Sequence, residues 1–169
     1  MGKTNALILR YIVEIEDAGT YKTVPDITSV DGFDLGEEGT IEVPEWDRNA
    51  MVADGKRKVT EMNMKFRLMQ NMQTFAYFKD WWENRAGNNR NVKVTWCKRN
   101  WVPIIEWIFE DCEFIKFGGE AQELGQVKLG IIELKFLPYE KRNAYPANTS
   151  APLDPNANKI SVASAPVLA

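Results

Sequence analysis

The side chains that could do chemistry in this chain are mainly carboxylates, and they gather in two places. One loop carries Asp31, Asp34, Glu37 and Glu38, and a later apolar segment carries Glu110, Asp111 and Glu113. Such groups could bind Ca²⁺, or could serve as the acid and base of a glycosidase. The loop lacks the ligand order of an EF-hand, and nothing in the sequence brings two carboxylates together. The spacing therefore favours solvated acidic surfaces over a metal or catalytic site.

Other residue types that catalysis commonly needs are missing or badly placed. The chain has no histidine, which removes the commonest general base and the commonest metal ligand. Ser29 is the only serine before Ser150, so a serine nucleophile has almost no candidate in the core. Neither GxGxxG nor the GxxxxGK[ST] phosphate loop occurs. We therefore expect a protein that is not an enzyme and that needs no cofactor.

The two cysteines, Cys97 and Cys112, lie outside any CxxC motif. The chain is also not a small, cysteine-dense scaffold of the kind that disulfides hold together. We expect two half-buried thiols in a reducing cytoplasm rather than a disulfide.

An aromatic run could be imagined as a platform for stacking nucleic-acid bases. It consists of Trp96, Trp101, Trp107 and Phe109. Proteins that bind single strands interleave such rings with basic residues, but here Glu106, Glu110 and Asp111 oppose Lys98 and Arg99. The interior of a sheet is the favoured interpretation.

Composition also limits the function classes. The formal net charge is −3 and 44% of residues are hydrophobic, so a core can form, and the basic excess of a sequence-reading DNA binder is missing. A near-neutral surface remains suitable for DNA to slide past, because cations that replace counterions would hold the DNA. No apolar run approaches the roughly 20 residues that span a bilayer, and charges interrupt the N-terminal stretch. We expect neither a signal peptide nor a membrane segment.

Strands must position most of these side chains. Alternating or continuous apolar patterns predict strands over residues 6–16, 20–30, 57–69, 92–98, 102–117 and 124–137. Pro25 should break the second of these or place it at a sheet edge. Asp54-Gly55 and Gly118-Gly119 indicate turns, and Gly130 indicates a bulge or bend.

One segment, residues 71–86, has helical spacing. Its predicted packing face consists of Met72, Phe75, Phe78 and Trp82, with Asn71 as the N-cap and Gly87 as the C-terminal stop. The expected fold is mostly β, a β-sandwich or open barrel of about six or seven strands with this amphipathic helix on one flank.

A long excursion between two extended segments has no evident role in a monomer. Residues 43–58 predict a hairpin that projects by roughly 20 Å. Ordinary hairpin loops are much shorter, with two to five residues. Its candidate contact residues are Trp46, Asp47, Arg48, Asn49, Met51 and Asp54. Exposed apolar groups on a projecting tip usually have a partner.

This order of hairpin, amphipathic strand and helix, followed by EWIFEDCEFIKFGGEAQELGQVKLGIIELKF at 106–136, resembles the tail tube proteins of contractile bacteriophage tails and their type VI secretion relatives. The resemblance covers roughly residues 5–140. It implies hexameric rings whose strands close into one β-barrel around a lumen, with rings stacked through the hairpin. It also implies a surrounding sheath, passage of double-stranded DNA without sequence-specific binding, no membrane contact at rest, and a place in the virion tail after synthesis in the host cytoplasm.

Two further interpretations stay open. The same fold could form the inner tube of a type VI secretion system, a pyocin or an extracellular injection particle. A monomeric β-barrel that binds a small molecule is the second. The expected organisation is a tube-like domain over 1–140 and an extended C-terminal arm over 141–169, which is rich in Ala, Asn, Ser and Pro.

Overall fold

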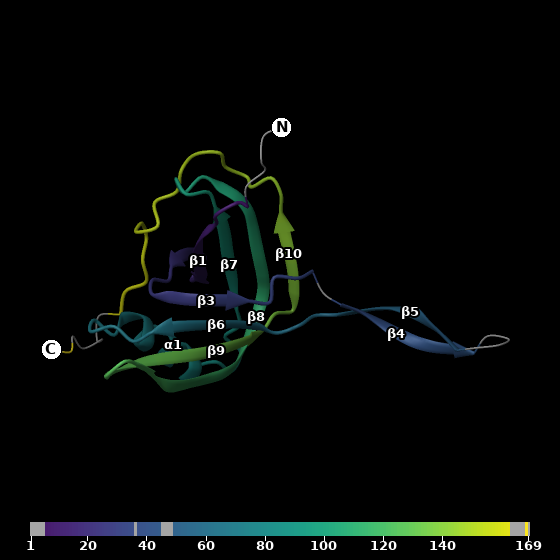
Figure 1. Ribbon diagram of the computed structural model, residues 1–169, viewed down its shortest axis with the longest axis horizontal. Helices are drawn as coiled ribbons and strands as arrows, with labels where there is room; N and C mark the ends of the chain where they lie inside the picture. Colours follow the sequence, from purple (N-terminus) through teal and green to yellow (C-terminus); the bar gives the residue numbers. More distant parts are fainter. Residues whose placement is uncertain (1–5, 36, 45–48, 163–167, 169) are drawn as a thin grey trace.

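The computed structural model describes residues 6–35, 37–44, 49–162 and 168, and it is built from antiparallel strands and one helix (Figure 1). The strands are β1 (Arg10–Asp17), β2 (Thr20–Thr23), β3 (Ile27–Asp31), β4 (Glu37–Pro44), β5 (Asn49–Lys58), β6 (Met62–Arg67), β7 (Arg90–Cys97), β8 (Pro103–Leu124), β9 (Val127–Leu137) and β10 (Glu140–Ala144), and the helix is α1 (Gln73–Glu83). The predicted mostly-β fold with a single helix is confirmed.

One eight-stranded sheet forms the body, in the order β2-β1-β7-β8-β9-β6-β3, with β10 also paired to β8. The 22-residue β8 belongs to two parts of this sheet. Up to Cys112 it pairs with β7 and β10, and from Glu113 onward it pairs with β9. We call the part formed by β2, β1, β7, β10 and the first portion of β8 the β7 half. The part formed by the rest of β8 with β9, β6 and β3 is the β9 half.

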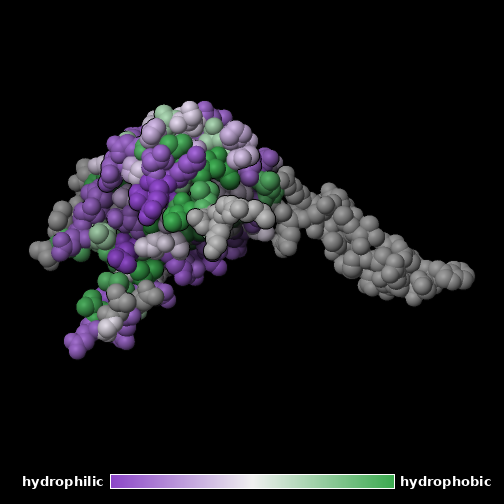
Figure 2. Space-filling view, turned by 45° about the horizontal axis from the view of Figure 1, so that its top comes forward, coloured by the Kyte–Doolittle hydropathy of each residue, from purple (hydrophilic) through white to green (hydrophobic). Residues whose placement is uncertain are grey.

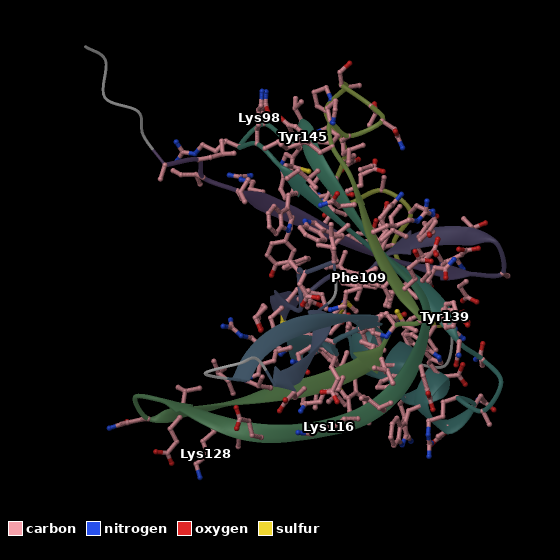
Figure 3. All side chains as sticks on the ribbon, turned by 90° about the vertical axis from the view of Figure 1, so that its right-hand side faces the viewer. Lys98, Phe109, Lys116, Lys128, Tyr139 and Tyr145 are labelled. Atoms are coloured by element: carbon pink, nitrogen blue, oxygen red, sulfur yellow. The ribbon has the colours of Figure 1, made fainter. Side chains whose placement is uncertain are left out.

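The sheet bends at Asp111, whose φ is 52°. The Asp111 N–H leaves the ladder and donates to Oδ1 of Asn91 on β7, at 2.8 Å. This irregularity lets the two halves face each other, and Figure 3 shows Phe109 between them and Lys116 along the β9 half. The result is one strongly bent sheet folded over its core, an arrangement between the β-sandwich and the open barrel that the sequence predicts.

The core fills the space between the two halves. Strand β6 shows the predicted alternation, because Met62, Met64 and Phe66 are buried while the residues between them are not. Side chains from β1, β7, β8 and β9 complete the same cluster. The interior is thus packed with apolar groups, which is the arrangement expected of a sheet folded onto itself.

Helix α1 closes the core against the β9 half, and its buried residues are Thr74, Tyr77, Phe78 and Trp81. Of the predicted face of Met72, Phe75, Phe78 and Trp82, Phe78 is fully buried and Phe75 and Trp82 pack against the core from the side, while Tyr77 and Trp81 were not predicted. Phe75 and Trp82 are half-buried at the flank, with ring centroids 5.5 Å from Phe117 and 5.2 Å from Phe114. Five aromatic residues spread over nearly half of the helix circumference, so periodicity alone does not identify which rings are central.

The helix is also shorter than the predicted 71–86. Met72 is its N-cap with φ 50°, and Asn84 is its C-cap. Asn71 still serves the first turn, since its Oδ1 accepts a hydrogen bond from the Gln73 N–H at 3.4 Å. Gly87, with φ 67°, lies in the turn beyond the helix rather than at its end.

Two dipeptides that were predicted to form turns lie inside strands. Asp54-Gly55 lies inside β5, opposite a register shift between Glu38 and Thr40, and forms a bulge instead of a turn. Gly118-Gly119 lies inside β8, whose ladder with β9 continues to the Leu124–Val127 pair. The turn comes at Gly125, with φ 65°.

Gly130 causes no bulge, because it pairs in register with Ala121. It instead allows a close approach of Leu68, whose backbone N–H donates to the Gly130 carbonyl at 2.9 Å. The irregularity in this ladder lies on β8, between Phe114 and Lys116.

The ends of the chain differ from each other. The first predicted strand begins only at Arg10, and the apolar residues Leu7, Ile8 and Leu9 before it are exposed. The predicted break at Pro25 is confirmed, because β2 ends before it and β3 begins after it, at opposite edges of the sheet.

The C-terminal segment packs on the body. It supplies strand β10, and further along Ile160 is buried in the core and its N–H donates to the Thr23 carbonyl at 2.9 Å. Residues 141–162 are therefore docked rather than free of the domain.

Candidate assembly surfaces

The hairpin of β4 and β5 is a two-stranded sheet of its own, and it projects from the body (Figure 1). Its register runs from Glu37 opposite Lys58 to Pro44 opposite Asn49. It thus starts several residues before the predicted boundary at 43. Of the predicted contact residues, Asn49 and Met51 lie on β5 and Asp54 lies in its bulge. Trp46, Asp47 and Arg48 lie outside the described residues.

The hairpin is entered through residues 32–35 and left through residues 59–61, which we call its first and second roots. The two roots come very close together. Gly32 in the first root has φ 95°, and a Cβ added there would lie 2.7 Å from the carbonyl oxygen of Glu61 in the second. Only glycine combines this backbone angle with this approach. The hairpin therefore leaves the body from a tight crossing of its two roots.

Phe33, the next residue, anchors the first root in an aromatic cluster. Its ring centroid lies 5.0 Å from Trp96, 5.4 Å from Trp107 and 6.0 Å from Phe109. These rings form part of the packed interior, in agreement with the predicted core interpretation of the aromatic run. Trp101 lies apart from them, with the Arg10 guanidinium 5.1 Å from its ring centroid.

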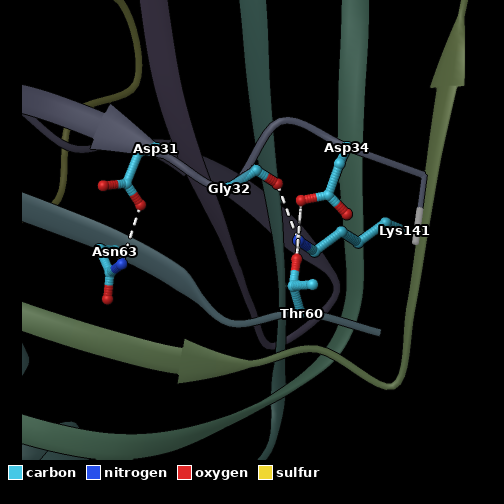
Figure 4. A network of polar contacts seen from close by, with 6 residues as sticks. All are labelled: Asp31, Gly32, Asp34, Thr60, Asn63 and Lys141. Carbon is cyan, nitrogen blue, oxygen red and sulfur yellow. Dashed lines mark hydrogen bonds and ion pairs between the residues drawn. The ribbon is translucent and has the colours of Figure 1, made fainter. Parts of the chain in front are cut away.

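A buried lysine joins both roots (Figure 4). Lys141 on β10 is 2% exposed. Its Nζ donates to the Gly32 carbonyl at 2.8 Å, to Thr60 Oγ1 at 2.7 Å and to Asp34 Oδ2 at 3.3 Å. The Thr60 hydroxyl in turn donates to the same Asp34 oxygen, at 2.7 Å. Nothing in the spacing of the sequence identifies Lys141, because its partners lie far away along the chain.

The predicted acidic clusters are distributed over separate contacts. Asp31 accepts a hydrogen bond from Asn63 at 2.9 Å, Asp34 belongs to the Lys141 network, and Glu110 pairs with Arg142 at 2.8 Å. Among the residues that the structure describes, no group of three or more His, Cys, Asp or Glu side chains could hold a metal ion. The side chains of Glu37 and Glu38 fall outside that part of the chain.

Cys97 and Cys112 are free and fully buried, so the prediction of unpaired thiols is confirmed and their burial exceeds the expectation. Burial raises the pKa of the Cys97 thiol to about 11 and that of Cys112 to about 12. Protonated, enclosed thiols are poor nucleophiles. These two cysteines are packing residues in this fold.

The β9 half turns a charged face away from the core. Across the ladder, Lys65 on β6 lies opposite Glu133 on β9, and the Glu133 carboxylate also pairs with Lys116 of β8 at 3.3 Å. Lys135 reaches the Glu61 carboxylate at 3.9 Å. This face therefore carries charges of both signs, with ion pairs at Glu133 and Glu61 and with Lys116 opposite Lys135 in the ladder.

The same half has two open edges. On one side, β8 from Glu113 to Leu124 pairs only with β9 within the described residues, and on the other, β3 pairs only with β6. Tyr11 covers part of the β3 edge by donating to the Ile27 carbonyl at 3.1 Å. Open strand edges are sites where another chain can add a strand.

Two hollows among the described residues are open to solvent and small. One of about 290 Å³ lies beside Tyr11 and Pro155, and one of about 320 Å³ lies beside Leu137 and Tyr139. The space between the two halves is occupied by rings such as Phe78, Phe109 and Phe136. This packed interior differs from the empty barrel of a small-molecule carrier.

Apolar groups remain at the surface. On the face drawn in Figure 2 they gather toward the middle, with hydrophilic groups around them. The exposed large apolar side chains include Leu7, Ile8, Val127, Tyr139 and Tyr145. None of the described helical residues forms a helix with the length and hydropathy that crossing a bilayer requires.

No protein-family model and no curated protein matches the chain. Solved structures do match it. A chain of the 6-fold symmetrised baseplate of the anti-feeding prophage aligns over 85% of this chain and 98% of that one, with a TM-score of 0.65 and 14% identity. The sheath-tube complex of the PVC extracellular contractile injection system aligns over 80% and 88%, with a TM-score of 0.62 and 12% identity. The tube-terminating cap of the anti-feeding prophage aligns over 86% and 95%, with a TM-score of 0.67 and 12% identity. The chain therefore has the tail-tube fold of contractile injection systems.

Proposed function

We propose that this chain is the tube subunit of a contractile, phage-like tail. Six copies form a ring, and rings stack into a hollow tube inside a sheath. The protein is structural and non-enzymatic, and in a phage it resides in the virion tail after synthesis in the host cytoplasm. The observation that carries the proposal is the β4–β5 hairpin, which projects from a body that already has its own packed core.

The anchoring of the hairpin supports a role as a connector. A two-stranded ribbon alone is marginally stable in water, yet here its roots are fixed by Gly32, Phe33 and the Lys141 network. In the proposed tube it reaches the neighbouring ring, and Trp46, Asp47, Arg48, Asn49, Met51 and Asp54 are the proposed contact residues. A contact between a projecting element and a different surface is heterologous, and it propagates rather than closes.

The open edges of the β9 half support ring closure. Each copy offers the outer edge of β8 from Glu113 and the outer edge of β3. Pairing these edges between neighbours would continue the four strands of this half into a closed barrel without unpaired edges. The charged outer face, whose lysines are partly paired with Glu133 and Glu61, would then line the lumen, where double-stranded DNA passes without being held.

Shortening the hairpin tests the axial contact. Deleting residues 40–53 keeps the outer register pair of Glu38 with Arg57 and leaves Gly39, Asp54, Gly55 and Lys56 as the loop, and Asp-Gly suits a hairpin turn. Negative-stain microscopy of the intact protein should show rings and tubes. The shortened protein should form rings that do not stack.

Two outcomes would contradict the proposal. An intact protein that remains monomeric at every concentration would exclude a tube subunit. Tubes of normal length from the shortened protein would exclude the hairpin as the axial contact. Circular dichroism of the shortened protein serves as the folding control, because its body retains every residue of the core.

A second candidate is the tube of an extracellular injection particle. The structures with TM-scores of 0.62 to 0.67 described above come from the anti-feeding prophage and the PVC system. In such a particle the cargo of the tube would be protein. Particles purified with this subunit would carry a DNA-filled capsid in the phage case and would lack one in the other.

A further inference from the structure

We infer that the buried ammonium group of Lys141 holds the direction in which the hairpin points, in addition to the backbone crossing at Gly32 and the anchor at Phe33. Lys141 belongs to β10, in the C-terminal part of the chain, whereas the strands of the hairpin, β4 and β5, lie between Glu37 and Lys58. The inference concerns the mechanics of one subunit. Only its consequence for stacking rests on the proposed function.

The position of Lys141 is imposed by the sheet. In the pairing of β10 with β8, Lys141 lies opposite Phe109, and its Nζ lies 5.8 Å from the Phe109 ring centroid. The aliphatic stem thus packs at the core, and the ammonium group reaches the roots of the hairpin. Because β10 is fixed to β8, the charge is held by the body and not by the hairpin.

The acceptors account for the whole ammonium group. A lysine has three N–H donors, and they meet three acceptors: the Gly32 carbonyl, Asp34 Oδ2 and Thr60 Oγ1. Gly32 and Asp34 lie before β4, and Thr60 lies after β5. A buried charge is tolerated only where it is paired and hydrogen-bonded. This charge therefore penalises any movement of either root away from the other.

A surface ion pair could not impose the same restraint. Lys135 also forms an ion pair with the second root, through Glu61 at 3.9 Å, but its side chain is 33% exposed whereas that of Lys141 is 1% exposed. Water can replace the partner of an exposed lysine at little cost. Lys135 is consequently the matched control for Lys141.

The test measures hairpin direction in dispersed subunits. Nitroxide labels are placed at Ala50→Cys on β5 and Lys79→Cys on the exposed side of α1, because the native thiols are buried. Pulsed electron resonance then gives the distribution of distances between the labels. In Lys141→Met, which keeps the stem, the width of the distribution should at least double. Lys135→Met should leave it unchanged.

Milder variants keep the test valid if Lys141→Met does not fold. Thr60→Val and Asp34→Asn each remove or weaken one acceptor and retain Lys141, and each should broaden the distribution by a smaller factor. Unchanged widths in all folded variants would overturn the inference.

Microscopy of the same variants separates the two proposals. A broadened distribution together with rings that fail to stack supports both. A broadened distribution with normal tubes upholds the role of Lys141 and removes the hairpin from the axial contact.

Discussion

The indole ring of Trp81 stacks on the phenyl ring of Phe136, with centroids 5.0 Å apart and an angle of 23° between the ring planes. The pair joins α1 to β9, and both residues are fully buried. The Trp81 indole N–H donates to the Asn88 carbonyl at 2.8 Å, so its polar atom is satisfied inside the core. Together with the equally buried Phe78, Trp81 thus fixes the helix to the β9 half.

Replacing Trp81 should therefore be among the costliest changes in the chain. Trp81→Ala removes a fully buried ring and leaves a cavity, and we expect a loss of about 3 to 5 kcal/mol in the free energy of unfolding. Trp82→Ala is the matched control, because its ring is only half-buried and should cost less. Denaturant unfolding curves give both values. Equal losses would contradict the assignment of Trp81 as a central ring and Trp82 as a flanking one.

The close approach of Leu68 to Gly130 gives a second prediction. A Cβ on residue 130 would lie 2.6 Å from Leu68 Cδ1. Gly130→Ala should destabilise the protein by about 1 to 3 kcal/mol, because overpacking forces side chains out of their rotamers. The double variant with Leu68→Ala should lose less than the sum of the two single changes, as a double-mutant cycle measures. Additive losses would show that the two residues do not compete for the same space.

Local patterns were sufficient for much of the fold. The alternation of β6 predicts its buried face because the period of a strand is fixed by the backbone. Pro25 predicts a break because proline cannot donate to a ladder. Gly118-Gly119 misleads because a long partner, β9, keeps both glycines in the sheet, and this partner is set by tertiary pairing.

The assembly surfaces could be predicted only in part. The length and tip composition of residues 43–58 indicate a projecting hairpin without knowledge of the fold. The network at its roots could not be predicted, since Lys141 lies more than 100 residues from Gly32 and Asp34. A lysine in a polar-looking segment gives no sign of burial until β10 pairs with β8.

Stability should fall at alkaline pH. Burial raises the pKa of Tyr77 from 10.0 to about 12. It also raises the pKa of the Cys97 thiol from 9.0 to about 11 and that of the Cys112 thiol from 9.0 to about 12. A raised pKa in the folded state means that the contribution is complete below the unfolded value and is lost as pH rises. The contribution of these groups to the free energy of unfolding should stay constant up to about pH 9 and decline toward pH 12.

Guanidinium unfolding at a series of pH values measures this decline. Cys112→Ala and Tyr77→Phe should each reduce its slope, and Tyr139→Phe, which alters a 78% exposed ring, serves as the control. A stability that stays constant to pH 11 would contradict the burial of these groups.

The docked C-terminal segment gives the last prediction. Ile160 is 5% exposed, its N–H bonds the Thr23 carbonyl at 2.9 Å, and Thr23 also pairs with Lys159. Ile160→Ala should cost about 2 to 5 kcal/mol, because it opens a cavity in the core. Val162→Ala, at a half-buried position, should cost less. If the segment were a free arm, both changes would be neutral in the dispersed subunit, and limited proteolysis would release the segment from both variants and from the unaltered protein at the same rate.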